Sequence, residues 1–169
     1  MVNFKTRLEK VKTFIFDVDG VISEEKVYFL GDEPIKSFNN KDGYALQLAI
    51  KKGYNICIIS GGRSVAMQSR LQKLGITELF FSTHDKLACY KDYITIHNLN
   101  EDEIIYMGDD LPDWEVMKRV GVPVCPADAS PEIKEISIYV SRKKGGEACV
   151  RDIIEQTMRC QGKWEIGKW

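Results

Sequence analysis

Two groups of aspartates follow apolar segments at separate places in the chain. Asp17 and Asp19 come directly after an apolar run, in the stretch FIFDVDG, and Asp109 and Asp110 follow another run and precede Asp113. Carboxylates that lie close together repel one another and raise one another's pKa. A hard divalent cation removes this conflict, and a small set of oxygen ligands with room for water and phosphate suits Mg²⁺. The spacing therefore predicts a Mg²⁺ site that includes a reactive carboxylate.

Further polar residues follow two other apolar runs. Ser60 ends one run and precedes Gly61, and Lys86 follows another. With a metal bound, Asp17 can attack phosphorus as a nucleophile, and Asp19 can give a proton to the leaving oxygen and later take one from water. The Ser60 hydroxyl can bind a phosphoryl oxygen, and Lys86 supplies positive charge where the transition state spreads negative charge. Together these residues predict phosphoryl transfer through an aspartyl-phosphate.

Each motif has a simpler interpretation when it is taken alone. DVDG is common in acidic turns, although an EF-hand calcium loop is excluded because Val21 and Ile22 stand where that loop needs a ligand and a glycine. Ser60-Gly61 is typical of plain turns, Lys86 of solvated helices, and GDDLPD of capped helix starts. A response-regulator receiver uses similar residue types in another order along the chain. The ordered combination is what favours a phosphoryl-transfer site.

The rest of the sequence alternates between short β-rich runs and helical stretches. Strands are predicted at 13–16, 55–60, 79–82, 103–108, 121–125 and 137–140. Helices are predicted at 42–52, 64–74, 85–97, 112–120 and 146–160. This alternation predicts an α/β fold, a Rossmann-like three-layer sandwich with a mainly parallel sheet. Because ligands bind at the carboxyl ends of the strands in such sheets, the four polar strand ends should meet at one place.

One segment interrupts this alternation. Residues 21–38 contain two β-like halves around a central LGD sequence, which predicts a β-hairpin inserted after the first strand. No internal repeat, low-complexity stretch or linker divides the rest of the sequence. We therefore assign residues 1–169 to a single domain, with a C-terminal tail at about 161–169.

The composition is that of an ordinary globular protein. The 169 residues are enough for a sizeable core, and a net charge of −1 does not indicate binding to nucleic acid or to a membrane. The N-terminus lacks the apolar region of a signal peptide, and no run of about 20 apolar residues predicts a membrane span. The five cysteines lack CxxC or zinc-site spacing. We therefore expect a reducing, cytoplasmic location.

The ordered motifs DVDG, ISGG, Lys86 and GDDLPD resemble those of the haloacid dehalogenase superfamily of phosphatases. The chain is more closely similar to the 3-deoxy-D-manno-octulosonate 8-phosphate (Kdo8P) phosphatases over roughly residues 10–164, in FNNKDGYALQLA, IISGGRS, YMGDDLPDWEVMKRVG, YVSRKKGGEACVRD and QGKW. The resemblance implies a haloacid dehalogenase-like hydrolase domain. It also implies a Mg²⁺-dependent enzyme that hydrolyses Kdo8P to Kdo and phosphate, in the supply of Kdo for lipopolysaccharide.

The same resemblance implies roles for the residues of the motifs. Asp17 would be the nucleophile and Asp19 the general acid and base. The metal ligands would be Asp17, the backbone carbonyl of Asp19, and Asp109. Ser60 and Lys86 would bind the phosphoryl group. Residues that support the metal or Lys86 would be Asp110 and Asp113.

Many members of the superfamily carry a cap domain over the site, and this sequence has no room for one. Between Asp19 and Ser60 there is space for a hairpin and a helix, and between Ser60 and Lys86 for one helix and one strand. A capless site needs another cover, because phosphoryl transfer benefits from the exclusion of water. In the resembled family the hairpin mediates a tetramer and a neighbouring subunit helps to cover the site, so we expect a homotetramer. The alternative is a hairpin that only covers the edge of its own sheet.

The sequence favours one substrate and leaves others open. Related enzymes act on Kdn 9-phosphate or N-acetylneuraminate 9-phosphate. The position after Ser60-Gly61 is arginine in many Kdo8P enzymes and acidic in the Kdn type; here Gly62 stands there, followed by Arg63. The missing carboxylate favours Kdo8P. We assign Gly61 and Gly62 to substrate binding, and Arg63 or Arg70 to the substrate carboxylate, although both arginines are also typical of solvated helices.

Two further possibilities concern assembly. Similar domains occur fused to nucleotidyl-sugar synthetases, so a non-catalytic oligomerisation module is an alternative function, which the intact acidic residues and lysine argue against. In the resembled family the C-terminal tail can reach a neighbour's site. Lys163 and Trp164 are the residues of this tail that could take part.

Overall fold

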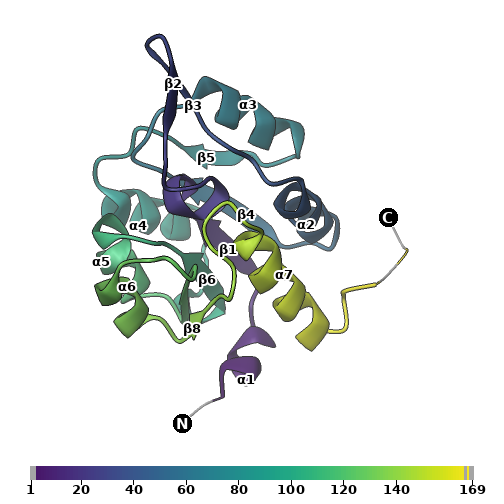
Figure 1. Ribbon diagram of the computed structural model, residues 1–169. Coiled ribbons are helices and arrows are strands. Elements are labelled where there is room, and N and C mark those ends of the chain that lie inside the picture. Colours follow the sequence, from purple (N-terminus) through teal and green to yellow (C-terminus); the bar gives the residue numbers. More distant parts are fainter. Residues whose placement is uncertain (1–2, 166, 168–169) are drawn as a thin grey trace.

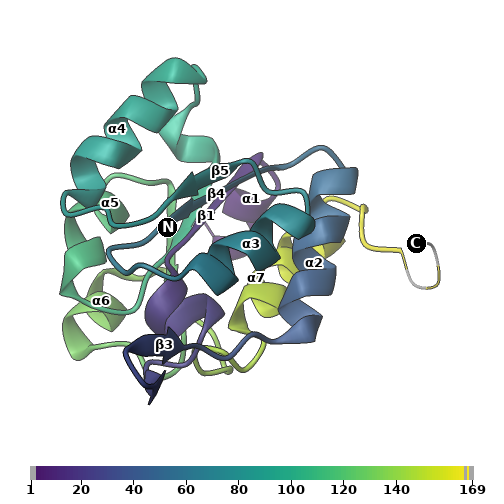
Figure 2. The same ribbon diagram turned by 90° about the horizontal axis from the view of Figure 1, so that it is seen from above.

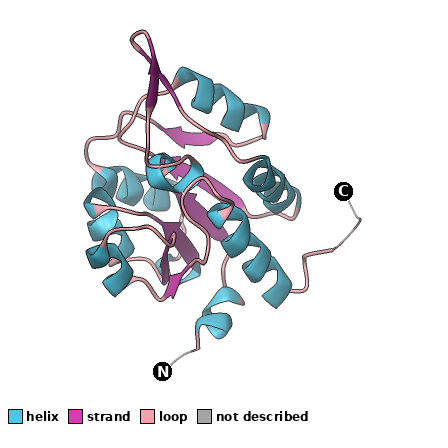
Figure 3. Ribbon diagram, in the orientation of Figure 1, coloured by secondary structure: helices cyan, strands magenta, loops and turns pink. Residues whose placement is uncertain are grey.

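The computed structural model of the protein describes residues 3–165 and residue 167. Its centre is a parallel six-stranded sheet with the order β5-β4-β1-β6-β7-β8 (Figures 1 and 3). The strands are β1 (Thr13–Phe16), β4 (Asn55–Ile59), β5 (Glu78–Phe80), β6 (Ile104–Met107), β7 (Val122–Cys125) and β8 (Tyr139–Val140). The chain starts at β1, builds one half of the sheet through β4 and β5, and then builds the other half from β6. The predicted parallel α/β fold is confirmed.

Helices cover both faces of this sheet (Figure 2). One face carries α1 (Phe4–Leu8), α2 (Asn40–Lys51), α3 (Val65–Lys73) and α7 (Cys149–Cys160). The other face carries α4 (Lys86–Ile96), α5 (Trp114–Met117) and α6 (Pro131–Ile136). Of the helices within the described residues, none has the length and apolar character that a membrane span requires.

The central strand β1 shows why the sheet is buried on both sides. Phe14 and Phe16 contribute to the core under α2 and α7, whereas Ile15, between them, contributes to the core under α4 and α5. All three side chains are fully buried. Successive side chains of a strand point to opposite faces, so a continuous apolar run such as the FIF of β1 is typical of a strand covered on both sides.

The predicted insertion after β1 is a hairpin of β2 (Tyr28–Leu30) and β3 (Glu33–Ile35), paired antiparallel. It projects from the body of the molecule at the top of Figure 1. The strands are shorter than the predicted segment because residues 18–22 form a tight turn, in which Gly20 has a φ of +76°. Only this turn, the hairpin and α2 lie between β1 and β4 in the chain, and only α3 and β5 lie between β4 and α4, so the capless architecture is confirmed.

Two helix predictions were wrong in their bounds. The segment predicted as a helix over 112–120 is a short turn, Leu111–Asp113, followed by α5, which ends at Met117. The helix predicted over 146–160 begins only at Cys149, because residues 141–148 form a loop that lies against the turn after β1. The Gly146 amide donates a hydrogen bond of 2.9 Å to the Val21 carbonyl in this contact.

Candidate active site

The carboxyl ends of the three central strands meet beside Asp17. In the register of the sheet Phe16 pairs with Ile58 of β4 and with Met107 of β6, so Asp17 lies where these three strands end. Its side chain is almost fully buried, and Oδ1 accepts a hydrogen bond of 2.6 Å from the Val18 amide. The polar strand ends predicted to meet therefore do so at the centre of the sheet.

Lys86 brings a positive charge to Asp17 from the first turn of α4. Its Nζ lies 2.7 Å from Asp17 Oδ2 and 2.7 Å from Asp113 Oδ1, and its side chain is 6% exposed. Burial by itself would lower the pKa of Lys86, but the charges of Asp113 and Asp17 outweigh burial and the pKa is raised. Lys86 therefore stays protonated beside the carboxylate at the end of β1.

Asp113 holds Lys86 in place through its own buried hydrogen bonds. It is fully buried, its Oδ1 accepts a hydrogen bond of 2.6 Å from the Tyr106 hydroxyl, and its Oδ2 accepts one of 3.1 Å from the Asp109 amide. A side chain at Gly108 would overlap the Asp113 carboxyl group, so glycine is required at the start of GDDLPD. Since both oxygens of Asp113 have partners, this residue positions Lys86 and the backbone of Asp109.

The acidic side chains are close enough to perturb one another. Asp17, Asp109 and Asp113 each offer a carboxylate oxygen within 4.8 Å of the others. Burial, followed by the charge of Asp113, raises the pKa of Asp17 to about 7, while Lys86 acts in the opposite direction. Burial, followed by the charges of Asp17 and Asp113, raises the pKa of Asp109 to about 8. Full ionisation of this group is unfavourable unless more positive charge is present.

A hard divalent cation fits the chemistry of Asp17 and Asp109. No hydrogen bond or ion pair reaches the Asp109 carboxylate from the part of the chain that the structure describes, so its oxygens are available. Gly20 gives the space for this carboxylate, because a Cβ at that position would overlap it. Oxygen-only donors suit Mg²⁺. The side chain of Asp19 lies outside the acidic group, which leaves its backbone carbonyl as the atom predicted to bind a metal.

Known proteins share these motifs and this fold. A family model for haloacid dehalogenase-like hydrolases matches residues 72–151. The Kdo8P phosphatase KdsC of Yersinia pestis is 36% identical over 160 residues, which cover 94% of this chain and 86% of the relative. The chain belongs to the Kdo8P phosphatase family. The resemblance drawn from the ordered motifs is thus confirmed.

Solved structures of the Kdo8P phosphatase family superimpose closely on this chain. The crystal structure of the Yersinia pestis enzyme has a TM-score of 0.91 at 36% identity, and the match covers 95% of this chain and 87% of that one. The Kdo8P phosphatase of Moraxella catarrhalis, solved in complex with magnesium, phosphate and Kdo, has a TM-score of 0.90 at 26% identity. That match covers 94% of this chain and 92% of the other.

The residues predicted after β4 border the same site. Ser60 is fully buried, and its Oγ accepts a hydrogen bond of 3.2 Å from the Gly62 amide. A Cβ at Gly62 would lie 2.7 Å from Asp19 Oδ2 and 3.6 Å from Ser60 Oγ, so both side chains border this glycine. Gly61 is exposed, and a Cβ there would be in ordinary contact with the Thr83 carbonyl oxygen at 3.6 Å. The Ser60–Gly62 segment therefore forms the wall beside Asp19.

Arg63 and Arg70, the two arginines predicted to bind the substrate carboxylate, do not contact the acidic group around Asp17. Arg63 is exposed and lines a groove of about 330 Å³ between the hairpin and the start of α3. Arg70 lies over the Phe38 ring, with its guanidinium carbon 5.0 Å from the ring centroid, and donates to Asn40 Oδ1 at 3.4 Å. Within the described residues, neither arginine forms an ion pair with the acidic group around Asp17.

Asp110 and Asp113, the two residues predicted to support the metal or Lys86, differ in burial and in their contacts. Asp113 contacts Lys86 directly, whereas Asp110 is exposed and its side chain makes no hydrogen bond within the described residues. The charge of Asp110 helps to raise the pKa of Asp109, after burial and the charges of Asp17 and Asp113. Of Asp110 and Asp113, therefore, only Asp113 contacts Lys86.

Two residues of this site were not predicted from the sequence. Tyr106 places its hydroxyl on Asp113, and Lys36, directly after β3, contacts Asp19. A tyrosine inside a buried strand was a usable signal, because a buried hydroxyl needs a hydrogen-bond partner. Lys36 carries no such signal, since it is an isolated lysine next to a hairpin and only the tertiary structure brings it to Asp19.

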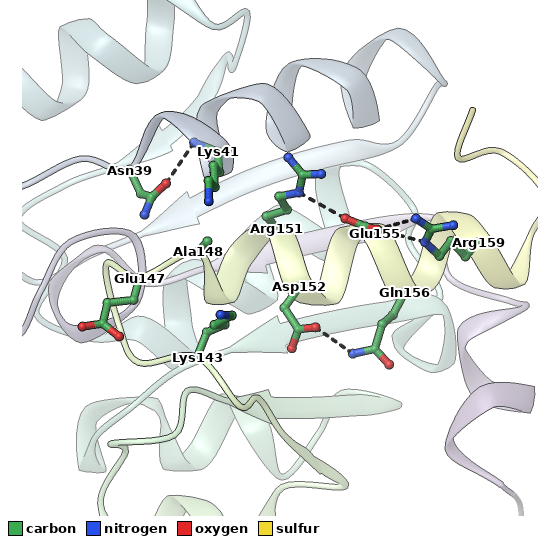
Figure 4. Close-up of a pocket in the computed structure, with 10 residues that line it drawn as sticks. All are labelled: Asn39, Lys41, Lys143, Glu147, Ala148, Arg151, Asp152, Glu155, Gln156 and Arg159. Carbon is green, nitrogen blue, oxygen red and sulfur yellow. Dashed lines mark hydrogen bonds and ion pairs between the residues drawn. The ribbon is translucent and has the colours of Figure 1, made fainter. Parts of the chain in front are cut away.

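A separate groove of about 690 Å³ runs along α7 (Figure 4), and its lining residues do not include Asp17, Asp109 or Lys86. Part of the charge in this groove is paired, because Glu155 contacts both Arg151 and Arg159. We assign no ligand to this groove. Next to it, Trp164 packs edge-on against Tyr44, so this described part of the tail lies against its own subunit.

Proposed function

We propose that this chain hydrolyses Kdo8P to Kdo and inorganic phosphate, with Mg²⁺ as cofactor, through an aspartyl-phosphate on Asp17. The observation that carries this proposal is the buried contact of Asp17 with Lys86 at the end of the central strand, in a member of the Kdo8P phosphatase family. Asp109, with its available oxygens, is next to Asp17 and suited to the metal. By the same family membership, the reaction supplies Kdo for lipopolysaccharide.

The residues have separate tasks in this reaction. When bound at Asp17, Asp109 and the Asp19 carbonyl, Mg²⁺ supplies positive charge that offsets the phosphoryl and carboxylate charges. Asp17 attacks phosphorus, and Lys86, held 2.7 Å from Asp17 Oδ2, stabilises the charge of the transferring phosphoryl group. Asp19 gives its proton to the departing oxygen and then takes one from the water that releases phosphate from Asp17.

Phosphate release from Kdo8P, Kdn 9-phosphate and N-acetylneuraminate 9-phosphate, measured side by side with Mg²⁺, tests the proposal. We expect the highest kcat/KM for Kdo8P and no detectable turnover by Asp17→Asn, because an amide is a poor nucleophile. Asp92→Asn, on the exposed side of α4, is the control and should keep normal activity. Turnover of none of the three esters would favour the non-catalytic oligomerisation module, and unchanged activity of Asp17→Asn would contradict the mechanism.

We propose further that the protein is a homotetramer assembled through the hairpin. The support is a row of exposed apolar side chains on β2, where Tyr28 is 58%, Phe29 70% and Leu30 74% exposed. Exposed contiguous apolar surface of this kind is typical of interfaces. Light scattering should give four times the chain mass, and Leu30→Asp should lower it, whereas Ile96→Asp, which changes an exposed apolar residue on α4, should not. A wild-type monomer at micromolar concentration would contradict this proposal.

Two further assignments belong to the same proposal. We propose that residues 1–169 form one hydrolase domain and that the protein works in the cytoplasm. The first is supported by the six-stranded sheet, which takes strands from Thr13 to Val140 and has one face covered by α7. The second is supported by five free cysteines, of which Cys57, Cys125 and Cys149 are buried thiols. Limited proteolysis and cell fractionation test them.

A further inference from the structure

Lys36 holds the side chain of Asp19 from the base of the hairpin. Its Nζ lies 2.6 Å from Asp19 Oδ1 and 2.7 Å from Asp19 Oδ2, so the ammonium group contacts both carboxylate oxygens. The Lys36 side chain is only 5% exposed, although the residue directly follows the exposed strand β3. An ion pair with one partner so well buried has a more defined geometry than a pair of solvated side chains.

The backbone of Gly62 forms the surface on which this pair lies. A Cβ at Gly62 would be 2.7 Å from Asp19 Oδ2 and 2.9 Å from Lys36 Nζ. Both distances are shorter than a carbon atom tolerates, so a side chain at this position would displace the pair. The turn after β1, the base of the hairpin and the loop after β4 therefore meet at Lys36, Asp19 and Gly62.

The two buried lysines of the site contact different carboxylates. Lys86 contacts Asp17 and Asp113, whereas Lys36 contacts Asp19. In the proposed reaction Asp17 forms the bond to phosphorus and Asp19 moves the proton. The first lysine is thus associated with the phosphoryl group and the second with the proton-transfer residue.

We propose that Lys36 is a positioning residue that keeps the Asp19 carboxyl group oriented toward the departing oxygen, and that Gly62 provides the space for this contact. The inference rests on the proposed function. In the first step the bond from Asp17 to phosphorus forms, the bond from phosphorus to the sugar oxygen breaks, and that oxygen takes the proton of Asp19. In the second step water attacks phosphorus, its proton goes to Asp19, and Asp17 is released. In the carboxylic acid form of Asp19 one oxygen carries the proton and Lys36 donates to the other oxygen, whereas in the carboxylate form Lys36 contacts both oxygens. Lys36 loses no proton itself.

A comparison of two substrates separates positioning of Asp19 from a general structural role. The sugar oxygen of Kdo8P needs a proton to leave, whereas p-nitrophenolate leaves p-nitrophenyl phosphate without one. Because general acid catalysis contributes about 10²- to 10⁴-fold, we expect Lys36→Met to lower kcat/KM for Kdo8P by about 10- to 100-fold. For p-nitrophenyl phosphate we expect kcat/KM to stay within about threefold. Lys41→Met, which changes an exposed lysine in α2, is the matched control.

Gly62→Ala gives a second route to the same contact. It should cause the same selective loss for Kdo8P, and the double variant should lose little more than either single variant, because both changes remove one interaction. Equal losses on both substrates, or no loss on either, would overturn the proposal. If wild-type protein hydrolyses p-nitrophenyl phosphate but not Kdo8P, the proposed substrate is wrong. The comparison is then made with Kdn 9-phosphate, whose phosphate ester also needs a proton to leave.

Discussion

Asp42 is a buried carboxyl group whose replacement by asparagine should change the pH dependence of stability. It lies in α2 and is fully buried, and its Oδ1 accepts a hydrogen bond of 2.7 Å from the Arg151 amide in the first turn of α7. Its Oδ2 has no partner among the described residues. Burial raises the pKa of Asp42 to about 7, while the backbone amide and charge of Arg151 and the backbone amide of Ala148 act in the opposite direction. Asparagine keeps the acceptor for Arg151 and cannot ionise.

The shift from 3.8 to about 7 corresponds to about 4 kcal/mol of unfolding free energy. Because the native pKa lies above the unfolded one, the contribution of the protonated carboxyl is complete below pH 4 and is lost as the pH rises to 7. About 2–3 kcal/mol of this loss falls between pH 5 and pH 8.5. In Asp42→Asn the unpaired amide costs about 1–3 kcal/mol at every pH. The diagnostic quantity is therefore how the difference between the two proteins changes with pH.

Urea unfolding of wild type and Asp42→Asn from pH 5 to pH 8.5 measures this change. Saturating MgCl₂ in all samples keeps the titration of Asp17 and Asp109 the same in both proteins. We expect the unfolding free energy of Asp42→Asn to gain about 2–3 kcal/mol relative to wild type over this range. Asp92→Asn, which changes an exposed carboxyl, should show no such gain. Parallel pH profiles for wild type and Asp42→Asn would refute a pKa of about 7 for Asp42.

Three further predictions concern the proposed metal and Lys86. In Gly20→Ala the new methyl group would overlap the Asp109 carboxylate, so we expect calorimetry to show at least about tenfold weaker Mg²⁺ binding. The control is Gly53→Ala, because Gly53 also has a positive φ but has open space around it; this variant should bind Mg²⁺ normally. Asp113→Asn removes one partner of the buried Lys86, and denaturant unfolding should show a loss of about 3–5 kcal/mol. Chelation of the metal should abolish phosphate release without unfolding the protein, as circular dichroism can check, and added Mg²⁺ should restore it; turnover that persists in chelator would contradict the metal's role.

The sequence predicted the central sheet because its strands have local signals. After their first residue, TFIF and NICII are apolar, as parallel strands covered on both faces usually are, and the helical stretches between them define the order in the chain. The bounds were less well predicted where tertiary contacts compete with local preference. The start of α7 moved to Cys149 because Gly146 binds the Val21 carbonyl, a contact that joins segments far apart in the sequence.

In the active site, too, some residues were predicted from local signals and others depend on tertiary contacts. Asp17, Asp109 and Lys86 were predicted because each stands at a strand end or helix start within a motif, and parallel topology brings such ends together. Asp113 was predicted in a supporting role, but its choice over Asp110 as the partner of Lys86 depends on how the turn after β6 folds back over Gly108.

What the sequence by itself determined is the order of strands and helices and the chemical identity of the residues at the strand ends. Periodicity and spacing carry both, because they act through neighbours in the chain. Only the tertiary structure decided that Lys36 contacts Asp19, that Gly62 lies against this pair, and that the Asp42 carboxyl is buried under α7. These contacts join segments separated by 17 to more than 100 residues, and no local pattern records them. They depend on the packing of the hairpin and of α7 around the end of β1.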